Sequence, residues 1–164
     1  MMDTIALSSI RNLFPPYHRC ALLGVGNELC MDDFAGMEVV RTILRHGEFR
    51  DFLAVEGGSA PENVTGVITS FAPETLIVVD AAFCGLSPGE YTVLSPDDIT
   101  GKTFSTHMLP LPVMLSYLES VCGCTSAYIG IQPFCVDQGI GMHPDVQNGV
   151  LRLSKEILDF LDGN

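Results

Sequence analysis

Short apolar runs alternate with amphipathic stretches along most of the chain. Cys20–Val25 is a run of apolar and small residues that ends at Gly26 and Asn27, as expected of a buried strand. Residues 33–45 follow with apolar side chains at helical spacing. The same succession recurs and predicts further strands at 52–55, 75–79 and 127–131, with Tyr91–Leu94 as an additional edge strand.

Three more helices are expected between and after these strands. Ser59 and Glu62 have the spacing of a capping box, which predicts a helix start there that continues to Phe71. Residues 112–121 have a proline at their start and one apolar face. Pro144 opens the last helix, whose apolar stripe consists of Val146, Val150, Leu153, Ile157 and Phe160.

This alternation of strands and helices indicates the α/β class. It predicts a three-layer fold, in which a twisted, mostly parallel sheet has helices on both faces. Residues 19–164 form a single domain in this interpretation, and residues 1–18, which end near Pro15 and Pro16, form an N-terminal extension. Ligands of such sheets bind beyond the carboxyl ends of the strands, so candidate chemistry is sought there.

Composition narrows the function classes. The chain has 164 residues, of which 47% are hydrophobic and only 17% charged, which argues against disorder. The net charge of −12 argues against binding to nucleic acid or to anionic lipid, since both need Lys and Arg. No run of about 20 apolar residues and no signal-peptide core are visible, so we expect a cytoplasmic protein with its six cysteines reduced and no membrane partner.

The exit of the first strand carries two adjacent acids, Asp32 and Asp33. A dinucleotide fingerprint would need glycine where Leu29 stands, and the acids would repel a pyrophosphate, so a nucleotide site is rejected. Acids at this place commonly cap the following helix, and capping is favoured here over a metal or catalytic role.

Two other polar residues are expected at the same sheet edge. Asp80 ends the strand at 75–79, where it serves either in a site or in a turn that binds nearby backbone amides. His107 stands just before a helix, as a loop residue, a cap or a ligand. Together with Asp33 they offer two oxygens and one imidazole, which suit nickel, zinc or manganese. By itself this set does not single out a metal site, because many α/β chains contain one.

Five segments in order make the chain similar to a known family. They are GVGNELCMDDFAG (24–36), GGSAPEN (57–63), LIVVDA (76–81), THMLPL (106–111) and YIGIQP (128–133). The set resembles the hydrogenase maturation endopeptidases, most of all the type that serves hydrogenase 3, over residues 20 to 160. The resemblance implies the α/β fold and a peptidase that removes a C-terminal peptide from the precursor of a nickel–iron hydrogenase large subunit after nickel insertion.

The resemblance also assigns roles to residues of this sequence. The family's metal ligands fall on Asp33, Asp80 and His107, with the two aspartates as the catalytic candidates. The nickel is expected to be carried by the precursor, although zinc or another divalent ion could occupy the site in vitro. Asn27 and the amides of Gly57 and Gly58 are candidates for holding the substrate backbone.

Two residues depart from the pattern common among relatives. Glu56 stands where aspartate is common, and Phe34 where glycine is common. Glu56 could change contacts near the substrate groove, and Phe34 could narrow the approach to the metal. Two other functions remain open at this point: a nickel-checking chaperone that binds the precursor without cutting it, and a small-molecule hydrolase on the same scaffold.

Overall fold

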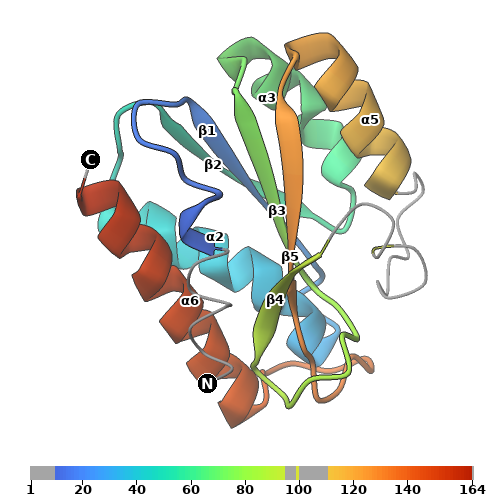
Figure 1. The fold of residues 1–164 in the computed structure, drawn as a ribbon. Coiled ribbons are helices and arrows are strands. Elements are labelled where there is room, and N and C mark those ends of the chain that lie inside the picture. The colour runs from blue at the N-terminus through green and yellow to red at the C-terminus, as the bar shows by residue number, and fades with distance from the viewer. Residues whose placement is uncertain (1–9, 95–98, 100–110, 164) are drawn as a thin grey trace.

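A five-stranded, mostly parallel sheet forms the centre of the molecule (Figure 1). A computed structural model describes residues 10–94, 99 and 111–163. The strand order is β2-β1-β3-β5-β4; the first four of these strands are parallel, and β4 runs antiparallel to β5 at the edge. The strands are β1 Cys20–Val25, β2 Phe52–Gly58, β3 Thr75–Ala81, β4 Tyr91–Leu94 and β5 Thr125–Ile131.

Helices cover both faces of this sheet, as expected from the sequence. Figure 1 shows α2 (Ala35–His46) and α6 (Pro144–Asp162) on one face, and α3 (Thr65–Phe71) and α5 (Leu111–Cys122) on the other. Two short 3-10 helices, η1 (Met31–Phe34) and η2 (Pro61–Val64), lead directly into α2 and α3. The three-layer α/β prediction is confirmed.

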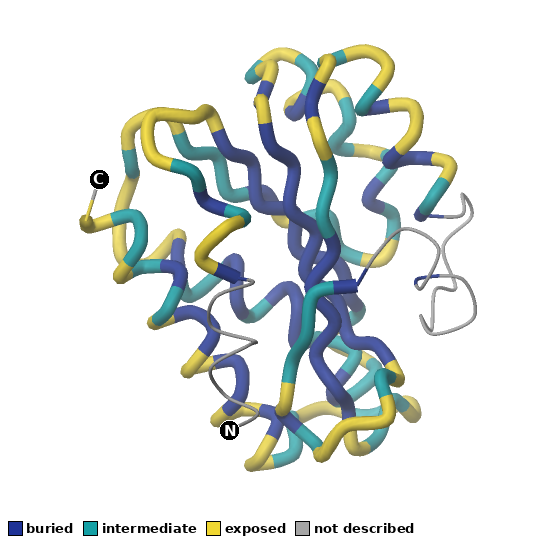
Figure 2. The backbone as a smooth tube through the Cα atoms, viewed as in Figure 1, coloured by how far each residue is buried: buried dark blue, intermediate teal, exposed yellow. Residues whose placement is uncertain are grey.

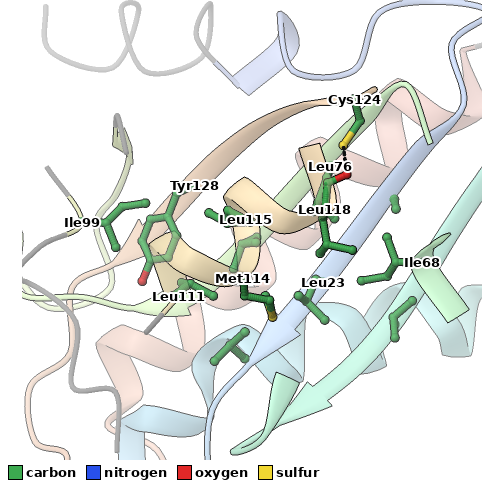
Figure 3. Packing of buried hydrophobic residues seen from close by; sticks show 14 of the residues in the cluster. Leu23, Ile68, Leu76, Ile99, Leu111, Met114, Leu115, Leu118, Cys124 and Tyr128 are labelled. Carbon is green, nitrogen blue, oxygen red and sulfur yellow. Dashed lines mark hydrogen bonds between the residues drawn. The ribbon is translucent and has the colours of Figure 1, made fainter. Parts of the chain in front are cut away.

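The alternation of side chains along the strands divides the core in two. Leu23, Leu76 and Tyr128 belong to the cluster under α3 and α5, part of which Figure 3 shows. Leu22 and Ile77, one residue away on their strands, belong to the cluster under α2 and α6. Burying such a side chain contributes about 1.5–3 kcal/mol, so the central strands fix the sheet on both faces.

Part of the N-terminal extension lies against the domain. Ile10 and Phe14 are buried in the cluster under α2 and α6. The Phe14 ring lies 6.1 Å from that of Phe160 and 6.4 Å from that of Phe52. The described portion of the extension therefore contributes side chains to the core. Among the described residues, no helix combines the length and the apolar character needed to cross a membrane.

Several details differ from the sequence-based expectation, among them the start of β5 at Thr125 and the start of α2 at Ala35. The capping box at Ser59 and Glu62 is wrong, because the helical segment begins as a 3-10 turn at Pro61 whose N-cap, Ala60, has no side-chain oxygen to offer. β2 continues to Gly58, since its polar end still pairs with β1 after a register shift. β3 continues through Asp80 to Ala81, so Asp80 is a strand residue and not a turn residue.

Candidate functional site

Asp33 and Asp80 approach each other at the carboxyl edge of the sheet. Asp80 is the second-last residue of β3, and Asp33 lies in η1, which follows the exit of β1. The start of α2 lies against the end of β3 so closely that a Cβ on Gly36 would come within 2.1 Å of a β3 carbonyl oxygen. The missing side chain at Gly36 therefore lets η1 bring Asp33 over the end of the strand.

Asp80 is a buried carboxyl group with a specific partner. Asp80 is 2% exposed, and the Tyr128 hydroxyl donates to its Oδ2 at 3.0 Å. Burial raises the pKa of Asp80 well above its ordinary value, and the nearby charge of Asp33 raises it further. The hydrogen bonds from Tyr128 and the Ala81 amide oppose this shift only in part. The two carboxyl groups thus form an acidic pair, and a bound cation would offset the electrostatic repulsion between their ionised forms.

The third residue of the expected set lies outside the described residues. His107 belongs to 100–110, so its position stays a prediction. Within the described ranges, no group of three or more His, Cys, Asp and Glu side chains gathers in a way that could hold a metal ion. The described part of the chain accordingly contains two of the three expected ligands, Asp33 and Asp80, and the metal site itself stays a prediction.

Asn27 takes part in the site through its backbone. Its N–H donates to Asp33 Oδ2 at 2.9 Å, while its side-chain oxygen accepts the Leu29 N–H at 3.0 Å. The side chain thus closes the turn after β1, and the turn aims an amide at Asp33. This contact orients the Asp33 carboxylate, whereas the predicted role of Asn27 in binding substrate stays a prediction.

Gly57 and Gly58 pass close behind the same turn. A Cβ on Gly57 would lie 2.8 Å from the Gly24 carbonyl oxygen, so the two strands need glycine to approach here. Gly58 has φ +62°, its carbonyl accepts the Gly26 N–H at 3.0 Å, and its own N–H points at Met37 Sδ at 3.1 Å. These glycines fix the end of β2 against β1; their predicted substrate contacts are untested.

Asp32 has a role that the sequence did not indicate. Its carboxylate is fully buried and accepts three backbone N–H groups from the loop between β5 and α6. Oδ2 accepts from Phe134 at 2.8 Å and Cys135 at 2.9 Å, and Oδ1 accepts from His143 at 2.7 Å. The expectation that Asp32 caps the following helix is wrong, because its oxygens bind a loop more than 100 residues away; Cys30 takes the N-cap position of η1 instead.

Tyr128 is the other residue that the sequence analysis missed. It is the buried side chain of β5 with a polar tip, and its hydroxyl is the group that reaches Asp80. Its position within an apolar strand hid this role, since tyrosine is common in strands for packing reasons alone. The available signal was the Tyr128 hydroxyl itself, because a buried tyrosine hydroxyl needs a hydrogen-bond partner.

Arg41 connects the two residues that depart from the common pattern. This α2 side chain pairs with the Glu56 carboxylate, bonds Glu28 at 3.2 Å, and has its guanidinium carbon 4.8 Å from the centre of the Phe34 ring. The Glu56 carboxylate is thereby ion-paired with a side chain of α2. Both departures belong to one partly exposed cluster beside the exit of β1.

Comparisons with known proteins agree with this geometry. The sequence profile of the hydrogenase maturation proteases (HycI) matches residues 37–160. The hydrogenase 3 maturation protease of Escherichia coli K12 is 36% identical over 113 residues, which cover 68% of this chain and 71% of that protein.

Solved structures give the same picture. The crystal structure of the [NiFe] hydrogenase maturation protease HycI from Thermococcus kodakarensis superposes with a TM-score of 0.85 at 28% identity, covering 94% of this chain and 99% of that one. The solution structure of the endopeptidase HycI from E. coli gives a TM-score of 0.73 at 32% identity, covering 83% and 86%. This chain, with its acidic pair at the carboxyl edge of the sheet, belongs to the hydrogenase maturation protease family.

Proposed function

We propose that this protein is an endopeptidase that removes a C-terminal peptide from the precursor of a nickel–iron hydrogenase large subunit after nickel insertion. Its family supports peptidase activity on hydrogenase precursors. The observation that carries the finer proposal is the convergence of Asp33 and Asp80. Asp80 is buried, its pKa is raised by that burial and by the neighbouring charge of the half-buried Asp33, and carboxylate oxygens placed together in this way suit a divalent cation.

The nickel belongs to the substrate in this proposal. When the precursor docks, its metal meets the oxygens of Asp33 and Asp80 and the imidazole of His107. The cation offsets the repulsion between the two carboxylates, and so favours the ionised form of Asp80 in the complex. Recognition of the metal then also places the adjacent peptide beside the acidic pair, and a precursor without nickel lacks this contact.

The hydrolytic step needs a water oriented toward the scissile carbonyl. The substrate's metal or one carboxylate of the pair polarises this water, which adds to the carbonyl carbon. The peptide C–N bond then breaks, and the proton given up by the attacking water passes to the released amine, so that the products are a carboxylic acid and an amine. Tyr128 keeps the Asp80 carboxyl in place through its hydroxyl, and the Asn27 amide does the same for Asp33.

A reducing compartment suits this assignment. All six cysteines lie among the described residues, and none of them forms a disulfide. Such a chain has no need of an oxidising environment. The compartment that we propose for the reaction is the cytoplasm.

The test is the intact mass of a nickel-loaded large-subunit precursor before and after incubation with the protein. The proposal expects loss of one C-terminal peptide, with no loss from nickel-free precursor. Asp33→Ala, Asp80→Asn and His107→Ala are expected to abolish cleavage, while Asp159→Ala on α6 and His46→Ala at the end of α2 retain it.

Each contrary result has a definite meaning. An unchanged mass with a stable complex would replace the peptidase by a non-cleaving nickel-checking chaperone. Full processing by the His107→Ala variant would remove that residue from the site. Equal cleavage of loaded and nickel-free precursor would refute the metal contact.

A further inference from the structure

Exposed apolar side chains gather on the loops around the acidic pair. Of the twelve large hydrophobic side chains that are exposed in the described residues, five lie on the three loops that follow β1, β3 and β5. They are Leu29, Phe83, Leu86, Phe134 and Ile140. Figure 2 shows these loops at the lower edge of the molecule, beyond the carboxyl ends of the strands. We call these five side chains the apolar rim.

Hydrogen bonds of the backbone and of the Gln132 side chain join the three loops that carry the rim, so its exposure is a property of the fold. Gly139 donates to the Leu29 carbonyl at 2.8 Å and accepts the Met31 N–H at 3.1 Å, which joins the first loop to the third. The Gln132 side-chain oxygen accepts the N–H of Cys84 at 2.8 Å and that of Leu86 at 3.3 Å, which joins the second loop to the third.

Asp32 adds a buried anchor to this assembly. Its three bonds fix both ends of the third loop, at residues 134–135 and at His143. The loop nevertheless presents Ile140 at 86% exposure and Phe134 at 63%. A fixed surface that keeps such side chains in water is preorganised for a partner, because little conformational entropy is lost when the partner covers it.

The charges of the rim select among possible partners. Glu28 and Asp137 are exposed on the first and third loops, and Glu28 is ion-paired with Arg41 of α2. The three loops themselves, residues 26–34, 82–90 and 132–143, contain no Lys or Arg. Two copies of this surface would bring like charges together, and anionic lipid headgroups would be repelled. A chain segment that combines apolar with basic side chains is complementary.

We propose that the apolar rim is the docking surface for the part of the hydrogenase precursor that flanks the cleavage point, and that this part presents apolar and basic side chains. The inference rests on the proposed function, since it names the surface that the same substrate meets. Asp33 directly follows the anchor Asp32, so a segment seated on the rim lies next to the acidic pair. The rim supplies binding energy, whereas Asp33 and Asp80 act on the bound peptide and its metal.

The test uses the full chain and the purified, nickel-loaded precursor. Leu29→Gln, Ile140→Gln and the double variant remove apolar contact without removing an internal contact of the core. Leu151→Gln on α6 is the matched control, because Leu151 is 54% exposed and Leu29 is 56% exposed. Thermal unfolding of each variant checks that the fold is retained. Cleavage kinetics give KM and kcat, and titration of the precursor gives Kd independently of cutting.

The double variant is expected to raise KM and Kd about tenfold and to leave kcat within about twofold, because the lost contacts bind the substrate without touching the reacting atoms. The control should match the wild type, and Kd should rise with salt because the flanking charges contribute. An unchanged Kd in the double variant would overturn the proposal.

Other outcomes are equally decisive. If self-association of the wild type is lost in the double variant while Kd for the precursor is unchanged, the rim joins two copies of this chain instead. If the wild type binds precursor through the rim but does not cut it, the peptidase assignment fails and the docking surface stands. If the wild type does not bind the precursor at all, the docking proposal fails.

Discussion

Removal of the Asp32 carboxylate is expected to destabilise the protein strongly, although Asp32 lies outside the hydrophobic core. The carboxylate accepts three N–H groups at 2.7 to 2.9 Å while fully buried. Hydrogen bonds to charged groups contribute about 1.5–3 kcal/mol each, and an unsatisfied buried donor costs about 1–3 kcal/mol. A water entering the space left in Asp32→Ala would satisfy part of this demand, so we expect a loss of about 3–4 kcal/mol.

Asp32→Asn separates acceptor capacity from side-chain volume. Two of the bonds converge on Oδ2, so the asparagine oxygen can keep both and turn its NH₂ toward the His143 N–H. One bond is then lost, and two donors face each other. The expected loss is about 1.5–3 kcal/mol, less than that of alanine.

Urea unfolding at pH 7, followed by far-UV circular dichroism, measures these losses. Hydrogen exchange of the amides of residues 134, 135 and 143 shows whether the loop opens locally before the domain unfolds. Asp137→Asn, an exposed carboxylate of the same loop, is the control and should stay within about 0.5 kcal/mol of the wild type. Wild-type stability in Asp32→Asn, or protected loop amides in Asp32→Ala, would refute the anchoring role.

Three further predictions follow from other contacts. Burial and a neighbouring carboxylate raise the pKa of Asp80 in the folded state. The contribution of Asp80 to stability is therefore complete below its unfolded-state pKa of about 3.9 and is lost as the pH rises through its folded-state pKa. Asp80→Asn should be more stable than the wild type at pH 7, and this gain should disappear at pH 4, as measured by urea unfolding with chelator present. Gly36→Ala should lower the unfolding free energy by about 1–3 kcal/mol, because its Cβ meets carbonyl oxygens of two strands at 2.1 and 2.6 Å, whereas Gly66→Ala on α3, with nothing within 4 Å, should stabilise by up to about 1 kcal/mol. Arg41→Ala should cost less than about 1 kcal/mol, since its ion pairs are exposed, and a larger loss in thermal unfolding would contradict that estimate.

The parts of the fold that follow from local pattern could be predicted from the sequence. The bounds of β1 and β4 are those expected, because apolar runs that end at turn residues carry their own signal. β2 and β3 extend past the expected ends, since Glu56 to Gly58 and Asp80 to Ala81 pair with neighbours through backbone groups alone. Pairing by the backbone leaves no hydrophobic pattern to detect.

In the candidate site, too, some residues could be predicted from the sequence and others could not. Asp33 and Asp80 could be predicted because parallel strands bring their carboxyl ends to one edge, and the pKa of Asp80 reflects the charge of Asp33. The partners of Asp32 could not be predicted, because three backbone amides in residues 134–143 have no side-chain signature. The pairing of Tyr128 with Asp80 depends on the register of β3 against β5, which the sequence does not state.

The short 3-10 helix η1 explains how two adjacent acids come to serve different purposes. A 3-10 helix has three residues per turn, so consecutive side chains point about 120° apart. The Asp32 side chain therefore points into the protein and accepts an N–H group of the loop before α6. The Asp33 side chain accepts the Asn27 N–H, and its charge contributes, after burial, to the raised pKa of Asp80. The buried Asp32 carboxylate has its oxygens occupied by backbone amides, so the metal contact that we propose falls to Asp33. Exchange of either acid for the amide should consequently damage a different property, stability at Asp32 and cleavage at Asp33.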